Sequence, residues 1–306
     1  MKTMLKITLV LVLATLCVRW TLSAFGQETT KPAAGGEKPA AKSEVVKETW
    51  DWASAMQEVT KKFKGSAGVV MQVGDSTTRN ANAQAWGRAF AHKNAEAGHS
   101  DSDAKVLTWA HADADSEKNG WSLAGVDVNN DRTATAAKNL TTDGLLKGGP
   151  GELPPLKKLL ETYKPQVVVL MVGLIDASKK VKPEEAAGNL GKAIDQVLET
   201  GAIPVLITLP PDKVCLDEVK AINAKYLALA AEKKIPIIDL YGEVMARQPG
   251  EKWVGTLTDK EGRKMSVELA GGPPTEDNLK TGGYLLKSWL VVQKLKEVKA
   301  KAIDKK

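Results

Sequence analysis

Short, mostly apolar runs alternate with helical patterns along most of this chain, and this alternation limits the fold more than any other feature. Runs with the length and composition of buried strands lie at residues 69–73, 166–172, 202–209 and 235–240. Helical patterns follow the first three runs at about 80–97, 183–200 and 217–234, and a last one covers 283–302. Such spacing is typical of right-handed β-α-β crossovers. The sequence therefore predicts an α/β fold: a three-layer α/β/α sandwich with a central parallel sheet.

The segments between these runs are less regular, and we assign them by local composition. The expected elements are an outer helix over 46–63, a strand at 106–110, an extended apolar segment at 121–128, a strand-to-helix corner at 129–135, a loose glycine-rich stretch at 141–151, a short helix at 154–163 and a β-hairpin within 253–269.

The first 26 residues have the pattern of a secretory signal peptide. Lys2 and Lys6 precede an apolar run over 7–18, and small residues precede Gln27. The run is shorter than the roughly 20 residues that a membrane-spanning helix needs. We expect an exported protein, periplasmic or extracellular, whose mature chain has no permanent membrane span. Retention of the segment as an anchor is the alternative.

The rest of the chain divides into a linker, one helix and one domain. Residues 27–45 are rich in Pro, Ala, Gly, Lys and Glu and cannot bury enough apolar surface to fold, so we predict a disordered linker. The N-terminal helix covers 46–64 and the main domain 65–302. The sequence leaves the oligomeric state open.

Charge and cysteine content exclude several functional classes. Loss of residues 1–26 removes Lys2, Lys6 and Arg19 and no acid, so the formal net charge falls from +6 to +3. The chain has neither a basic stripe with interleaved aromatic residues nor the ligand spacing of a zinc site, so we expect no nucleic-acid partner and no metal. Cleavage leaves Cys215 alone, which rules out an intramolecular disulfide bond.

Gly74-Asp75-Ser76 lies where the first strand should end and a helix begin. In open parallel sheets, ligands gather at the carboxyl ends of the strands, which makes Ser76 a candidate site residue. The alternative is that Asp75, Ser76 and the following threonines only cap the helix.

Four short motifs occur in a fixed order: Gly74-Asp75-Ser76 after the first strand, Gly173-Leu174-Ile175-Asp176 after a middle strand, Pro210-Pro211 after the next strand, and Gly283-Tyr284 at the last helix. Together they resemble the SGNH, or GDSL-type, hydrolases, a family of esterases, lipases and carbohydrate deacetylases with a flavodoxin-like sheet. The resemblance spans about residues 65–298 and implies that Ser76 is the nucleophile. A serine needs a base to take its proton and preset donors for the oxyanion.

The oxyanion blocks depart from the family pattern. In the family, a glycine in a second sequence block helps to form the oxyanion hole. No glycine lies between Val128 and Thr142 here, so the N–H group of Asp131 or Ala134 would have to replace it. In the third block, formed by Gly173 to Asp176, Ile175 stands where the family has asparagine. Loss of one oxyanion donor typically lowers the rate about 100- to 1000-fold.

The last block, Asp-x-x-His in the family, lacks its histidine. Aligned on Gly283-Tyr284, the histidine position falls on Asn278 and the acid on Thr275. Aligned instead on Asp277 as the triad acid, the base position falls on Lys280. Both alignments stay open, and neither supplies a histidine.

The chain has three histidines, His92, His99 and His111. His92 lies 16 residues after Ser76 in the same expected helix, about 24 Å away. His99 falls in a polar loop. His111 follows the expected second strand and stays open as a base.

We therefore predict a degenerate SGNH hydrolase-like protein, non-catalytic or very weakly active, that binds a glycan or a small ester without a cofactor. The alternative is an active serine ester hydrolase that uses Ser76 with His111 or Lys280 as base. A nucleotide-binding flavodoxin-like domain is disfavoured because the chain has neither Gly-x-Gly-x-x-Gly nor the phosphate-loop lysine pattern.

Overall fold

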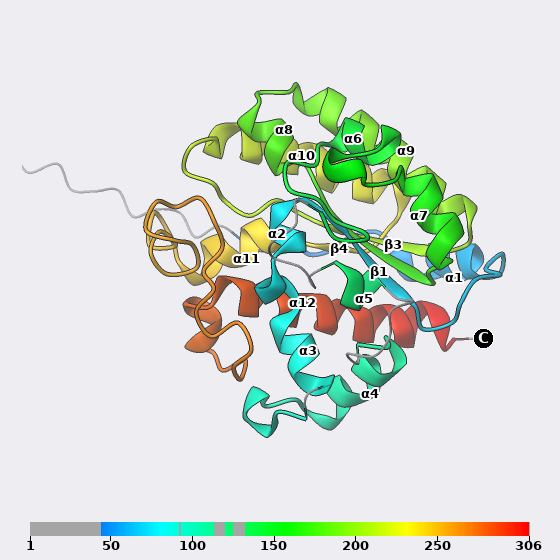
Figure 1. Cartoon of the computed structure of the whole chain (residues 1–306), viewed down its shortest axis with the longest axis horizontal. Coiled ribbons are helices and arrows are strands. Elements are labelled where there is room, and N and C mark those ends of the chain that lie inside the picture. The colour runs from blue at the N-terminus through cyan, green and yellow to red at the C-terminus, as the bar shows by residue number, and fades with distance from the viewer. Residues whose placement is uncertain (1–43, 92, 113–119, 125–131, 306) are drawn as a thin grey trace, which may run out of the picture. The chain divides into compact units, whose positions relative to one another are not determined.

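The computed structural model describes residues 44–305, except 92, 113–119 and 125–131. The predicted signal peptide and nearly all of the predicted linker therefore lie outside the described residues. In the described part, one parallel sheet has the strand order β1 (Val70–Gly74), β2 (Val167–Met171), β3 (Ile203–Ile207) and β4 (Ile237–Ile238) (Figure 1). The predicted central parallel sheet is confirmed.

The strands are in parallel register, so their carboxyl ends meet at one edge. Val70 pairs with Val167 and Gly74 with Met171, while Val167 also pairs with Ile203. Every residue of these strands is buried, as expected for a sheet that is covered on both faces.

Helices cover both faces of the sheet. Figure 1 shows α6 to α10 on one side and α3, α5 and α12 on the other, which confirms the three-layer α/β/α architecture. The α-helices are α1 (Trp52–Thr60), α2 (Ser76–Arg79), α3 (Ala85–Ala91), α4 (Asp101–Trp109), α5 (Gly120–Leu123), α6 (Thr142–Lys147), α7 (Leu156–Tyr163), α8 (Leu174–Ser178), α9 (Pro183–Glu199), α10 (Leu216–Lys233), α11 (Leu240–Arg247) and α12 (Gly283–Val298). Shorter helical turns are η1 (Ala81–Gln84), η2 (Ala95–Ala97), η3 (Pro150–Glu152), η4 (Asn278–Lys280) and η5 (Lys299–Ile303).

The long helices α9 and α12 form where the sequence predicted helices, at 183–200 and 283–302. Helix α9 begins at Pro183, with Glu184 and Glu185 in its first turn, where a missing N–H group and negative charge are both tolerated. Helix α12 places Leu285, Leu286 and other apolar residues in the core. None of the described helices is long and apolar enough to cross a bilayer.

The predicted strand at 106–110 is wrong, because this segment belongs to α4. The hydroxyl of Ser100 accepts the N–H of Asp103, and the Asp103 carboxylate accepts the N–H of Ser100, so the helix begins with a capping box. Val106, Leu107 and Ala110 are buried together at helical spacing. An apolar run this short fits a helix face as well as a strand.

Four other segments differ from their predicted form. The helix expected over 80–97 is interrupted: only α3 is α-helical, with η1 before it and η2 after it. The extended segment expected at 121–128 begins as α5, and 125–128 lie outside the described residues. The stretch at 141–151 holds α6, because the Thr141 hydroxyl accepts the N–H of Gly144 and caps a helix there. The helix expected over 46–64 is confined to α1.

The predicted hairpin within 253–269 is a tight turn with a single antiparallel bridge, between Thr258 and Met265. The Asp259 carboxylate accepts the N–H of Arg263, and Gly262 takes a left-handed conformation with φ of 67°, which glycine adopts at little cost. The N–H of Lys213 donates to the carbonyl of Gly262. This bond fastens the 258–265 turn to the segment that follows β3.

Candidate functional site

The Gly74-Asp75-Ser76 segment forms the passage from β1 to α2. A Cβ on Gly74 would overlap the Met171 carbonyl oxygen and the Thr78 hydroxyl, so the backbone approach there requires glycine. The Asp75 carboxylate accepts the N–H of Thr77 at 2.9 Å and caps α2. Ser76 makes no side-chain hydrogen bond within the described part of the chain. Asp75 therefore caps α2, and the Ser76 hydroxyl takes no part in the cap.

Ser76 faces a cavity of about 480 Å³ at the carboxyl edge of the sheet. Its wall comes from α2, the loop before α6, α8, the loop after β3, the 258–265 turn and the start of α12. Besides Ser76, the lining residues are Thr77, Arg79, Asn80, Lys138, Asn139, Leu174, Ile175, Ser178, Asp212, Arg263, Lys264 and Tyr284.

The third block places Ile175, and not Asp176, in the cavity wall. Gly173 precedes α8 with φ of 127°, and the half-buried Ile175 lies on the side that lines the cavity. Asp176 is buried away from it and accepts hydrogen bonds from the N–H (3.0 Å) and hydroxyl (2.6 Å) of Thr142. Burial raises the pKa of Asp176, an effect that these bonds oppose. Asp176 therefore joins α8 to α6.

In place of the second block, the structure brings Asn139 to the cavity. Ala134 lies in a turn that is closed by the Thr133 N–H and the Ala136 carbonyl, and it is not part of the wall; Asp131 lies outside the described residues. Asn139 has φ of 62°, in the left-handed region that glycine and asparagine favour. The sequence signal for this loop is Thr141, the N-cap of α6. It marks the start of the helix and so places Asn139 in the loop just before it.

The four candidates of the last block, Thr275, Asp277, Asn278 and Lys280, do not line the cavity. The side-chain amide of Asn278 donates to the Pro273 carbonyl at 2.9 Å. Lys280 forms an ion pair with Asp277 at 3.2 Å, and the Asp277 side chain is 94% exposed. The structure therefore brings neither alignment of this block to Ser76. Tyr284, from the Gly283-Tyr284 motif, is the residue of this region that does line the cavity.

No histidine of the described part lines the cavity. His99 contacts the Trp86 carbonyl at 2.9 Å, and burial lowers its pKa. A Cβ on Gly68 would lie 2.8 Å from His111 Nε2, which puts His111 before β1, whereas Ser76 follows it. Five strand residues separate the two ends by about 17 Å. His111, which the sequence left open as a base, therefore lies at the opposite edge of the sheet from Ser76. His92 lies outside the described residues.

Positive charge dominates the cavity wall. Among the residues that the structure describes, Arg79, Lys138, Arg263 and Lys264 line it, and the one carboxylate is that of Asp212. Asp212 is buried and accepts the N–H of Val214 at 2.9 Å, and burial raises its pKa while Arg263 opposes the rise. Sequence analysis missed this cluster because its cations come from three segments far apart in the chain.

Two buried groups of opposite charge, Lys287 and Asp75, lie under α2 and act on each other electrostatically. Lys287 is 2% exposed and its ammonium donates to the Thr77 carbonyl at 3.4 Å. Burial lowers its pKa to about 8, an effect that Asp75 opposes. Burial also raises the pKa of Asp75 to about 6, against the N–H of Thr77 and the charge of Lys287. No sequence signal marked Lys287, which lies within an apolar helical pattern.

The sequence model of the GDSL-like lipase/acylhydrolase family matches residues 72–261, more than half of the chain. No curated protein matches it.

Solved structures with a similar fold have low sequence identity to the chain. A GDSL-like lipase from Bacteroides thetaiotaomicron is 14% identical, with 80% of this chain and 98% of the other covered and a TM-score of 0.47. A lipase/acylhydrolase from Enterococcus faecalis is 17% identical, with 74% and 94% covered and a TM-score of 0.44.

Proposed function

The chain belongs to the GDSL-like lipase/acylhydrolase family, and we propose that it is a member that binds a ligand in the cavity beside Ser76 with little or no hydrolysis. The ligand would be a glycan or a small ester, which occupies the place that a substrate takes in an active hydrolase. In line with the signal-like N-terminus, we further propose that the protein acts outside the cytoplasm.

The observation that carries this proposal is the set of side chains around the Ser76 hydroxyl. A serine hydroxyl is a weak nucleophile unless a base within hydrogen-bond distance takes its proton. Among the described residues, the Ser76 hydroxyl has no hydrogen-bond partner, and the residues that line its cavity include no histidine. The one carboxylate among the described lining residues belongs to Asp212, which accepts the N–H of Val214.

The oxyanion side of the cavity supports the same proposal. Ile175 lines the cavity with a side chain that has no donor. Asn139 could still offer an amide, but one of the usual donors is missing, at a typical cost of about 100- to 1000-fold in rate. A missing base and a missing donor together favour binding over turnover.

An active serine ester hydrolase is the second candidate. It is favoured by Ser76 itself, because the capping bond of α2 comes from Asp75 and leaves the serine hydroxyl at the cavity. This candidate requires a base other than the triad histidine.

Hydrolysis of p-nitrophenyl acetate and p-nitrophenyl butyrate separates the two candidates. Wild type, Ser76→Ala and Ser178→Ala are compared, because Ser178 is an exposed serine of the same cavity and serves as a matched control. We expect all three proteins to give the same slow rate. A rate that Ser76→Ala abolishes and Ser178→Ala retains would establish the active hydrolase.

A further inference from the structure

We propose that the cavity beside Ser76 recognises an acidic saccharide, meaning a sugar that carries a carboxylate or sulfate group. This inference rests on the proposed function and names the chemical class of the ligand.

Charge is the first support. Among the described residues, four cationic side chains and one carboxylate line the cavity, and their formal charges sum to +3. Within the described part of the chain, no ion pair neutralises Lys138, Arg263 or Lys264. The neighbouring Lys213, in contrast, pairs with Glu251 at 2.9 Å. The acid next to Lys213 is thus bound outside the cavity, and the excess of cations among the described lining residues favours an anionic ligand.

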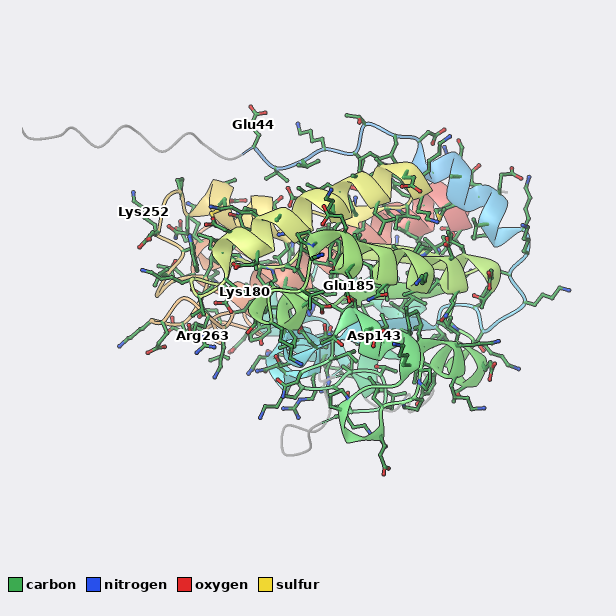
Figure 2. All side chains as sticks on the ribbon, turned by 90° about the horizontal axis from the view of Figure 1, so that it is seen from above. Glu44, Asp143, Lys180, Glu185, Lys252 and Arg263 are labelled. Carbon is green, nitrogen blue, oxygen red and sulfur yellow. The ribbon has the colours of Figure 1, made fainter. Side chains whose placement is uncertain are left out.

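The backbone holds two of these cations in place. Arg263 and Lys264 follow the left-handed Gly262 in the 258–265 turn, and the Lys213 N–H bond to the Gly262 carbonyl fixes the turn over the edge where β3 ends. Both side chains are exposed, and Figure 2 shows Arg263 at the outer surface of this region. A guanidinium offers the forked donor geometry that carboxylate and sulfate groups accept.

Neutral polar groups in the wall favour a hydroxyl-rich molecule over a bare anion. Asn139 and Ser178 are exposed to the cavity and can both donate and accept, as sugar hydroxyls require. Tyr284 adds an aromatic side chain. The volume of about 480 Å³ is within the range of small-molecule sites.

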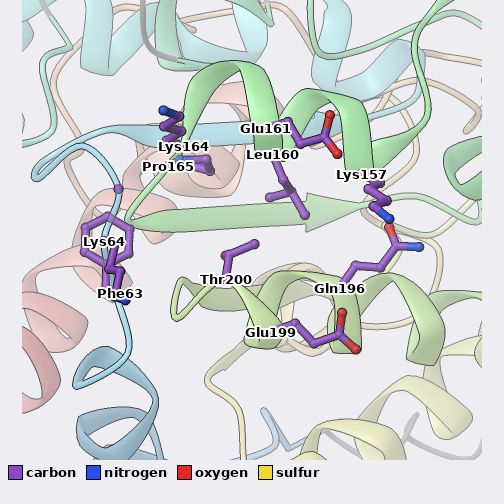
Figure 3. A pocket seen from close by; sticks show the side chains of 11 residues that line it. Phe63, Lys64, Lys157, Leu160, Glu161, Lys164, Pro165, Gln196, Glu199 and Thr200 are labelled. Carbon is purple, nitrogen blue, oxygen red and sulfur yellow. The ribbon is translucent and has the colours of Figure 1, made fainter.

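A second cavity provides a contrast within the same molecule. It has a volume of about 560 Å³ and lies between α7 and α9, where Lys164 and Thr200 precede β2 and β3 (Figure 3). It is therefore at the opposite edge of the sheet. Lys64, Lys157 and Lys164 line it together with Glu161 and Glu199, so its charges are nearly balanced.

Isothermal titration calorimetry of the full chain tests the inference. The probes are a chondroitin sulfate tetrasaccharide, a hyaluronan tetrasaccharide with carboxylates only, neutral maltotetraose, and inorganic sulfate. Each is titrated into wild type, into Arg263→Gln/Lys264→Gln, and into the control Lys157→Gln/Lys164→Gln, which removes two lysines from the second cavity. Circular dichroism checks that both variants fold.

We expect at least one acidic tetrasaccharide to bind at least about tenfold more tightly than maltotetraose and inorganic sulfate, and the Arg263/Lys264 variant to weaken this binding about tenfold. The Lys157/Lys164 variant should bind like wild type. The two acidic probes separate sulfate from carboxylate recognition.

Equal affinity for maltotetraose, equal affinity for inorganic sulfate, no binding of either acidic probe, or equal weakening in both variants would each overturn the inference. None of these results would make Ser76 a nucleophile, so the proposed absence of hydrolysis would stand. Ser76-dependent ester turnover, in contrast, would overturn the proposed function and leave the charge preference measurable in Ser76→Ala.

Discussion

The ammonium nitrogen of buried Lys287 lies 3.4 Å from the main-chain carbonyl oxygen of Thr77, the residue that follows Ser76. Asp75, also buried, supplies the negative charge that favours the protonated ammonium. One acid and one base are thus enclosed beneath α2. Since each charge is costly to bury without its partner, this pair makes the stability of the Ser76 region depend on pH.

Asp75 gives the first prediction. Burial raises its pKa from 3.8 to about 6. A carboxyl group with a raised native pKa stabilises the fold below its unfolded pKa, and this contribution is lost as the pH rises through about 6. We expect the free energy of unfolding to lose up to about 3 kcal/mol from this group between about pH 4 and about pH 6.5.

Urea unfolding of wild type and Asp75→Asn over this pH range measures the effect. Asparagine keeps an acceptor for the Thr77 N–H but does not titrate. Asp176 and Asp212 also have raised pKa values and act in the same direction, but they are present in both proteins. Parallel pH profiles for the two proteins would disprove the assignment to Asp75.

A double-mutant cycle tests the buried pair itself. Lys287→Met leaves the Asp75 carboxylate without its counter-charge, and we expect it to destabilise the fold by about 3 kcal/mol at neutral pH. Adding Asp75→Asn removes the second charge and should restore stability to within about 1 kcal/mol of wild type. Additive losses at neutral pH would show that the two side chains do not interact.

The strands could be predicted from the sequence because a parallel strand that is covered on both faces is a continuous apolar run, as at 166–172 and 202–209. The run at 106–110 has the same composition, and only the capping box at Ser100 and Asp103 shows that it is helical. Local patterns therefore predicted the sheet, and the strand predicted at 106–110 failed because it is a short run with a helix-start signal upstream.

The site could be predicted only where it is local in sequence. Ser76 and Ile175 belong to short motifs at strand ends, and both line the cavity. Arg263 and Lys138 reach the cavity from separate loops. The loop of Arg263 is held by the hydrogen bond from the Lys213 N–H to the Gly262 carbonyl, and that of Lys138 by the bridge between Gly74 and Ala136. Such long-range placement leaves no pattern in one sequence.

Asp176 yields a prediction on stability. We expect Asp176→Ala to lower the free energy of unfolding by about 2 kcal/mol, because it leaves the buried N–H and hydroxyl of Thr142 without their acceptor. Asp176→Asn keeps an acceptor and should lose less. The half-buried Asp143, which pairs with Lys147, provides the matched control Asp143→Ala, with an effect below about 1 kcal/mol. Equal losses for Asp176→Ala and Asp143→Ala would refute this role.

Restoring the family residue at position 278, alone or together with that at position 175, should not restore activity. In Asn278→His, the new imidazole starts from a position whose side chain points to the Pro273 carbonyl and does not line the cavity. We expect Asn278→His and Asn278→His/Ile175→Asn to hydrolyse p-nitrophenyl acetate no faster than Ser76→Ala. A gain of more than about tenfold that depends on Ser76 would mean that the 273–280 segment reaches the serine.

Covalent labelling of Ser76 by a fluorophosphonate is the most direct test of the central claim, because the probe reports an activated serine whatever the natural ligand is. Purified wild type and Ser76→Ala are incubated with the probe at neutral pH, and the adducts are counted by intact-protein mass spectrometry. We expect no adduct above the level of Ser76→Ala. Stoichiometric labelling of wild type that disappears in Ser76→Ala would show that a base does activate Ser76 and would contradict the account.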